Sequence, residues 1–168
     1  MHAIIKEILN ANNTNSFVFE REIEEPVKQL KCLTKGIKNS PGIYLVFCRE
    51  EISKEYNHLR VSINSTSYTL LYFGKAGGKT KAGKLLTQGL SGRINNVVSD
   101  RTRNLKDVRR GKYWKAIMNE FLISSFLVVY NYNEFPLSVE QTIYNYLNNN
   151  KLKYPLMNKE LGRGNTHT

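Results

Sequence analysis

The chain lacks the marks of a membrane or secreted protein. It has no stretch of about 18 apolar residues, which a membrane-spanning helix would need. Its first residues, MHAIIKEILN, have neither the apolar core nor the cleavage site of a signal peptide. Cysteine is also scarce, since Cys32 and Cys48 are the only two and no CxxC pair exists. We therefore expect a cytoplasmic protein, with no membrane contact, in which both thiols are reduced and buried.

Acidic side chains are few and unevenly placed. The chain has 14 Asp and Glu against 25 Lys and Arg, which gives a net charge of +11. Nearly all of the excess lies in residues 75–115, where twelve basic side chains face only Asp100 and Asp107. A localised excess is typical of a surface that binds a polyanion, whereas charge that serves solubility is spread out. A solvated lysine-rich loop is the plainer alternative.

Apolar residues make up 40% of the chain and aromatic residues 11%, enough for one packed core. Their pattern predicts an α+β fold with a small three-stranded antiparallel sheet flanked by helices. The strands are expected at residues 43–48, 69–73 and 125–132, where apolar, aromatic and β-branched residues are dense. Gly74 is expected to end the second strand, and Leu59–Ile63 is a candidate for a further one.

An N-terminal arm, residues 1–39, precedes the core of residues 40–168, which ends in a glycine-rich tail. The arm has helical spacing at Ile4–Leu9 and from Pro26 onward, and a candidate strand that begins at Ser16. This arm could pack on the core, contact a second subunit or bind DNA, and its sequence favours none of the three.

Two later helices carry polar residues of interest. Apolar residues recur at helical spacing from Leu90, and Arg93 lies at the edge of that stripe, where its side chain can leave the core. Ser138 and Gln141 match a capping box, which predicts a helix that begins there and carries Glu140 in its first turn. In the plainer interpretation, Glu140 only stabilises that helix end.

Two tripeptides in the expected strands, Gly42-Ile43-Tyr44 and Tyr72-Phe73-Gly74, resemble the paired motifs of the GIY-YIG nuclease superfamily. Three single residues follow in the family's order. Arg93, Glu140 and Asn158 stand where the family has its helix arginine, its metal-binding glutamate and its closing asparagine. Each tripeptide alone is a weak match, but five positions in order, separated by the expected strands and helices, make the resemblance specific.

The resemblance covers roughly residues 40–160, and two branches of the superfamily are nearest. The segment YFGKA, Tyr72–Ala76, is similar to the second motif of the bacterial excision-repair nuclease and of the small type II restriction endonucleases. The repair enzyme is far longer, and the Gly-rich, His-containing tail after Asn158 is similar to the ending of one restriction-enzyme branch. One position departs, because many relatives have a histidine four residues after the arginine, where this chain has Val97. Lys75, or another residue of the basic loop, is the candidate for that role.

The resemblance implies phosphodiester hydrolysis and gives these residues their roles. Arg93 would clamp a phosphate oxygen with its planar guanidinium, and Glu140 would hold one Mg²⁺ or Mn²⁺ ion per active site. Tyr44 would be the general base and Tyr72 its orienting partner, although the two roles could be reversed. The plainer interpretation of each tyrosine is a core aromatic of a strand.

Lys75 and Asn158 complete the expected catalytic set. Lys75 would contact a phosphate, and Asn158 would orient the site through hydrogen bonds. The side chains expected to bind backbone phosphates of DNA are Lys79, Lys81, Lys84, Arg101, Arg103, Lys106, Arg109, Arg110 and Lys112.

The hypothesis that follows is a Mg²⁺-dependent, sequence-specific endonuclease for double-stranded DNA, as type II restriction enzymes are. One site per subunit cuts one strand, so we expect a homodimer, and a restriction enzyme also needs a companion DNA methyltransferase in the cell. Two alternatives stay open. One is a structure-specific repair or mobile-element nuclease of the same superfamily, and the other is a non-catalytic DNA-binding module.

Overall fold

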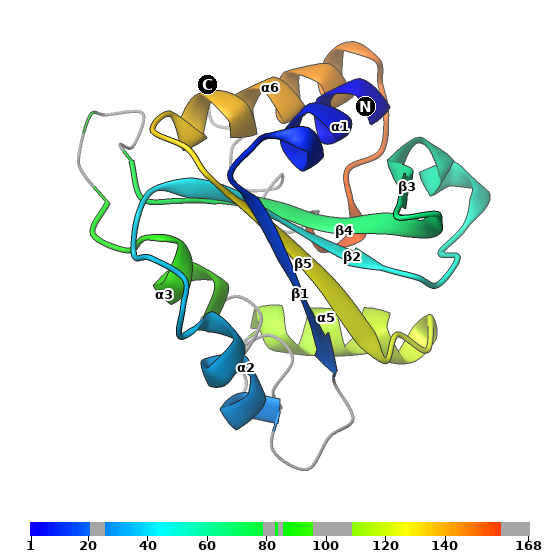
Figure 1. Cartoon of the computed structure of the whole chain (residues 1–168). Coiled ribbons are helices and arrows are strands. Elements are labelled where there is room, and N and C mark those ends of the chain that lie inside the picture. Colours follow the sequence, from blue (N-terminus) through cyan, green and yellow to red (C-terminus); the bar gives the residue numbers. More distant parts are fainter. Residues whose placement is uncertain (21–25, 79–82, 84–85, 96–108, 159–168) are drawn as a thin grey trace.

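The structure is a computed structural model that describes residues 1–20, 26–78, 83, 86–95 and 109–158. Its centre is one five-stranded antiparallel sheet, in which the strands lie in the order β1-β5-β2-β4-β3 (Figure 1). The strands are β1 (Thr14–Glu20), β2 (Gly42–Cys48), β3 (Arg60–Ile63), β4 (Thr66–Ala76) and β5 (Ser125–Tyr132).

The predicted α+β class is confirmed, but the prediction of a three-stranded sheet is wrong. The three expected strands are present as neighbours, β5, β2 and β4, and one more strand is added at each side. Strand β1 pairs with β5 along its whole length, so the arm packs on the core by extending the sheet. Strand β3 joins through a tight hairpin, because Asn64 and Ser65 adopt positive φ angles of 48° and 63°, as a type I′ turn requires.

Helices cover both faces of the sheet. The α-helices are α1 (His2–Asn10), α2 (Pro26–Thr34), α3 (Leu90–Ile94), α5 (Arg109–Glu120) and α6 (Pro136–Asn149), and the 3₁₀ helices are η1 (Lys54–Leu59) and η3 (Leu156–Asn158). In Figure 1, α1 and α6 lie above the sheet, whereas α2, α3 and α5 lie below it. None of the helices that the structure describes combines the length and the apolar character needed to cross a membrane.

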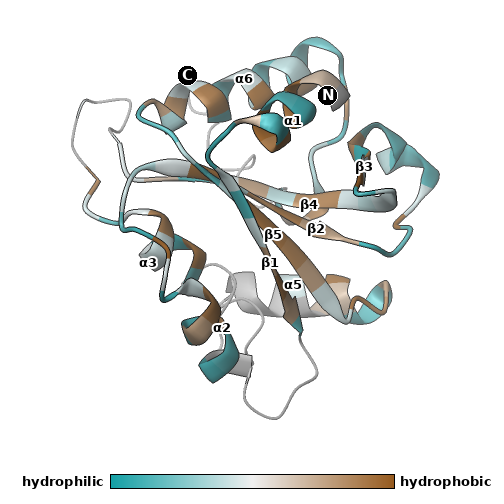
Figure 2. Cartoon of the chain, viewed as in Figure 1, coloured by the Kyte–Doolittle hydropathy of each residue, from teal (hydrophilic) through white to brown (hydrophobic). Residues whose placement is uncertain are grey.

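Strand β2 lies at the centre of the core. Every residue from Gly42 to Cys48 is buried, so this strand is covered on both faces. Figure 2 shows the same pattern as apolar colour along the central strands. On the face that α1 and α6 cover, Ile43 lines a groove together with Ile8 and Val139. On the other face, an aromatic pair connects the sheet to α5, as described below.

Helix α6 does not begin at the predicted capping box. It begins at Pro136, with Phe135 at the N-cap position and no side-chain cap there. Proline suits this first position because it has no N–H to satisfy, and the Asn133 side chain accepts the N–H of Phe135 at 2.7 Å. Ser138 is therefore inside the helix, and Glu140 lies in the second turn rather than the first. The helix dipole no longer explains why a carboxylate occupies this position.

Strand β4 also continues past its predicted end. Gly74 lies inside the strand, which ends only after Ala76, where Gly77 and Gly78 adopt positive φ angles of 64° and 71°. The sequence predicts that Gly74 ends the strand, but the structure shows that this glycine has a packing role. The extra residues bring Lys75 into the regular strand and fix the direction of its backbone N–H.

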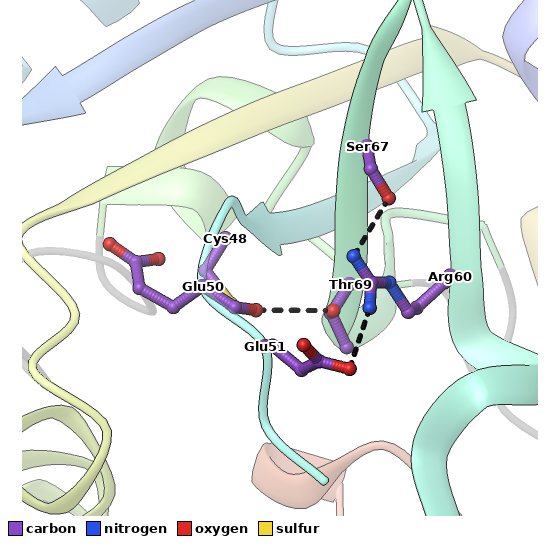
Figure 3. A network of polar contacts seen from close by, with 6 residues as sticks. All are labelled: Cys48, Glu50, Glu51, Arg60, Ser67 and Thr69. Carbon is purple, nitrogen blue, oxygen red and sulfur yellow. Dashed lines mark hydrogen bonds and ion pairs between the residues drawn. The ribbon is translucent and has the colours of Figure 1, made fainter. Parts of the chain in front are cut away.

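A polar network holds the other end of β2 and β4 (Figure 3). The Arg60 guanidinium donates to Glu51 at 2.9 Å and to the Ser67 hydroxyl at 3.1 Å. The Thr69 hydroxyl donates to the backbone carbonyl of Glu50 at 3.3 Å. These contacts tie the chain leaving β2 to the β3–β4 hairpin, at the end of the strands away from Gly42.

The two cysteines are both free thiols, as predicted. Cys48 is buried, and burial raises the pKa of its thiol far above the ordinary value. Cys32 is exposed on α2, so the prediction that both thiols are buried is correct for Cys48 only.

Candidate active site at the open edge of β4

The register of β2 and β4 brings the two motif tyrosines together. Tyr44 lies opposite Gly74 and Val46 lies opposite Tyr72, so both phenol rings project from the same face of the sheet. Their ring centroids are 5.7 Å apart, with an angle of 37° between the ring planes. This is the face that α3 and α5 cover (Figure 1).

The glycines of both motifs are explained by close packing. A Cβ atom on Gly74 would lie 2.8 Å from the hydroxyl oxygen of Tyr44, closer than real Cβ contacts come. A Cβ atom on Gly42 would lie 2.3 Å from the backbone oxygen of Asn131 and 2.4 Å from a methyl carbon of Leu90. Gly74 therefore leaves room for the Tyr44 phenol, and Gly42 lets the start of α3 approach β2 closely.

Helix α5 covers the tyrosine pair. The Trp114 ring lies 5.4 Å from the Tyr72 ring, and Trp114 is fully buried. Tyr44 and Tyr72 are themselves only 0% and 1% exposed. The phenols thus lie between β2, β4 and α5, below the solvent-accessible surface.

Part of β4 has an open edge. Strand β3 pairs only with Thr66–Thr69, so among the described residues no strand lies beside the outer edge of β4 from Leu70 onward. Asn158 of η3 occupies this edge in place of a strand. Its carboxamide accepts the N–H of Phe73 and donates to the C=O of Phe73, both at 2.9 Å. Asn158 is completely buried, so these bonds fix the 3₁₀ helix η3 against β4.

Glu140 occupies the next position along the same edge. Residues two apart on a strand point their N–H groups to the same side, so Lys75 directs its N–H outward as Phe73 does. The Glu140 carboxylate accepts a hydrogen bond from this backbone N–H. Glu140 and Asn158 therefore satisfy neighbouring backbone groups of β4, and both predicted residues lie at one edge.

The charges around Glu140 come from two different elements. Burial raises the pKa of the Glu140 carboxyl, while the Lys75 ammonium, the backbone bond from Lys75 and the Arg93 guanidinium each act to lower it. The effect of burial is the largest, so the carboxylate is incompletely compensated. Lys75, Arg93 and Glu140 are all half-buried, so this charged group reaches the surface.

Tyr144 is a further residue of the site, which the sequence motifs do not name. It lies one turn after Glu140 on α6, and the Asn158 side-chain amide donates to its hydroxyl at 3.4 Å. Its ring packs on Phe73 at 4.7 Å. Burial, followed by the negative charge of Glu140, raises the pKa of Tyr144. The i, i+4 spacing from Glu140 was the available indication that the two side chains are neighbours.

The predicted site residues divide into four groups. Lys75, Arg93, Glu140 and Asn158 gather around the open edge of β4, and Tyr44 and Tyr72 form a buried pair on the face beside it. Arg109, Arg110 and Lys112 are in α5, but the structure does not describe their side chains. The remaining predicted DNA contacts and Val97 lie outside the described residues: Lys79, Lys81, Lys84, Arg101, Arg103 and Lys106.

The donor set at this edge fits a magnesium ion that is bound together with a phosphate. Within the described part of the chain, no three His, Cys, Asp or Glu side chains cluster as a metal site. Mg²⁺ does not need such a cluster, because it keeps several waters and takes its other ligands from one or two carboxylates and from substrate phosphates. Glu140 supplies one carboxylate. Lys75 and Arg93 repel a cation on its own, and an anionic phosphate offsets that repulsion.

Comparison of this chain with protein-family models, with curated proteins and with solved structures found no match.

Proposed function

We propose that the protein is a Mg²⁺-dependent endonuclease that cuts double-stranded DNA at specific sequences, with the character of a type II restriction enzyme. One observation carries the proposal. Glu140 from α6, Arg93 from α3 and Lys75 from β4 come within electrostatic reach of one another at a strand edge, although up to 65 positions separate Lys75 from Glu140. This combination of one carboxylate and two cations suits a phosphodiester with a bound divalent ion.

Each group at the edge has a role in that chemistry. The planar guanidinium of Arg93 donates to phosphate oxygens and stabilises the charge that develops on them. The ammonium of Lys75 neutralises the same phosphate from the strand side. Glu140 would hold the Mg²⁺ or Mn²⁺ ion, which when bound supplies a Lewis acid for the phosphate and the leaving oxygen.

The tyrosines are proposed as base and orienting partner, with Tyr44 as the base. A phenol has an ordinary pKa of about 10, so a tyrosine base needs cations nearby to favour its ionised form. Both hydroxyls are buried, and the proposed role therefore requires the site to open so that water reaches a phenol. Because Tyr44 packs against Gly74, the Tyr44 hydroxyl lies next to β4, the strand that also carries Lys75.

A homodimer is proposed because each chain has one such site and cutting a duplex requires two. A restriction enzyme of this kind would act beside a DNA methyltransferase that protects the host DNA.

Incubation with plasmid DNA and Mg²⁺ tests the proposal. Discrete fragments with fixed ends are the expected result, and they should vanish when the metal is chelated or Glu140 is replaced by Gln. Nicks confined to branched or damaged substrates would favour the repair or mobile-element alternative. DNA binding without any cut would favour the non-catalytic module.

A further inference from the structure

A second cationic surface lies on α2 and the segment that follows it, outside the basic segment of residues 75–115. From Pro26 to Arg49 the chain contains no Asp or Glu, and it carries four lysines and one arginine. Counted over residues 1–40 the charge nearly cancels, because five glutamates precede Pro26. We call the following residues the lysine row: Lys28, Lys31, Lys35 and Lys38.

The lysine row begins on one flank of α2 and continues into the segment that follows it. At about 100° per residue, Lys28 and Lys31 lie about 60° apart around the helix, and Lys35 and Lys38 come after its last residue, Thr34. All four side chains of the row are exposed, whereas Leu30 and Thr34 turn inward and are buried. Figure 2 shows both polar and apolar colour on α2, as this division predicts.

Hydrogen bonds connect α2 to the helix that carries Arg93. The Thr34 hydroxyl accepts from the Asn95 side-chain amide at 2.6 Å, and the Thr34 carbonyl accepts from the Ser91 hydroxyl at 3.4 Å. Helices α2 and α3 lie side by side on the same face of the sheet (Figure 1). The row is therefore anchored to α3 within a few residues of Arg93, and it belongs to the same helical layer.

We propose that the lysine row binds the sugar–phosphate backbone of duplex DNA that extends away from the phosphate held at Arg93. From Lys28 to Thr34, the last residue of α2, the helix rises about 9 Å, and Lys35 follows directly. Duplex DNA presents about one phosphate per 3.4 Å of axis on each strand, so this length matches about three phosphates. Lysine suits contacts of this kind, because a flexible ammonium follows a backbone without reading bases. The inference deepens the proposed function, and it rests on that function for the nature of the substrate.

The salt dependence of binding to a short fluorescent DNA duplex tests the row. The measurement is made with chelator present, so that no cleavage occurs, from about 50 to 200 mM salt. The test variant is Lys31→Gln/Lys35→Gln. The control is Lys6→Gln/Lys151→Gln, which removes the same charge from exposed positions on α1 and just after α6. Thermal unfolding confirms that both variants are folded.

The expected result is that the slope of log affinity against log salt falls by about 1.8 in the test variant, or about 0.9 per lost phosphate contact. The control should keep nearly the parent slope. If the slope falls equally in the two variants, or falls in neither, the proposal that the lysine row binds DNA is overturned and the proposed function stands. A parent chain that does not bind duplex DNA would overturn both. Normal binding with the expected loss of slope, but no cleavage in Mg²⁺, would overturn the proposed function alone.

Discussion

The carboxylate of Glu140 accepts a hydrogen bond from the backbone N–H of Lys75, at the edge of β4 that no described strand covers. Glu140 belongs to the helical layer on one face of the sheet, and Arg93, whose charge acts on it, belongs to the layer on the other face. The two layers thus meet at this edge. A phosphate bound there would meet cations from β4 and α3 and a carboxylate from α6.

Replacing Glu140 by Gln should stabilise the fold at neutral pH. Burial raises the pKa of Glu140 above 4.5, so the folded chain holds this proton more tightly than the unfolded chain does. The stability linked to Glu140 is therefore fully present below pH 4.5 and is lost as the pH rises through the raised folded pKa. Gln keeps an acceptor for the Lys75 N–H without the charge.

Urea unfolding across the pH range measures this effect. The gain in Glu140→Gln over the parent should be present at neutral pH and should disappear in acid. Glu134→Gln is the control, since it removes an exposed carboxylate just before α6. A Glu140→Gln variant that is no more stable than the parent at neutral pH would show that the ionised carboxylate is fully compensated.

Gly74→Ala should destabilise the protein and displace the Tyr44 phenol. The added methyl would lie 2.8 Å from the Tyr44 hydroxyl oxygen and 2.9 Å from a ring carbon of Tyr72. Overpacking of this kind costs about 1–3 kcal/mol in the free energy of unfolding. Gly36→Ala is the matched control, because nothing lies within 4 Å of a Cβ atom there. If both variants unfold at the same denaturant concentration, the contact between Tyr44 and Gly74 is not tight.

Asn158→Ala should leave two buried backbone groups of Phe73 without partners. Each such group costs about 1–3 kcal/mol, so a loss of at least about 2 kcal/mol is expected on denaturant unfolding. Asn150→Ala removes an amide that donates to the Tyr146 carbonyl at an exposed position and should cost much less. Equal losses of stability in the two variants would mean that Asn158 does not hold η3 on β4.

Arg93→Ala should slow DNA cleavage at least about 100-fold, the scale of removing one donor to the transition state. Single-turnover cleavage with Mg²⁺ measures the rate. Arg60→Ala is the control, since Arg60 forms a largely exposed ion pair with Glu51 away from the site. Cleavage by Arg93→Ala at nearly the parent rate would remove the guanidinium from the mechanism.

Local periodicity predicted much of the fold. The strand expected at 125–132 is β5, the buried run at 43–48 is β2, and the helix expected to begin near Leu90 is α3. Errors arose where a local pattern competed with packing. Gly74 was interpreted as a strand end although its role is to admit the Tyr44 ring. Ser138 matched a cap, but Pro136 and the Asn133 side chain begin the helix earlier.

The candidate residues of the site could be predicted from the sequence, but their arrangement could not. The motifs named Tyr44, Tyr72, Arg93, Glu140 and Asn158 in order. What joins the last three is the open edge of β4, which depends on how far β3 extends, and no motif encodes that length. The lysine row could not be recognised from the net charge of the N-terminal arm, because the glutamates that precede α2 cancel its charge along the sequence.

The most direct test of the central claim compares cleavage and binding in Glu140→Gln. We expect this variant to bind its duplex DNA with nearly the parent affinity in the presence of chelator and to make no cuts in Mg²⁺, under conditions where the parent cuts to completion. Continued cleavage by Glu140→Gln at the parent rate would contradict the claim that the open edge of β4 is the active site.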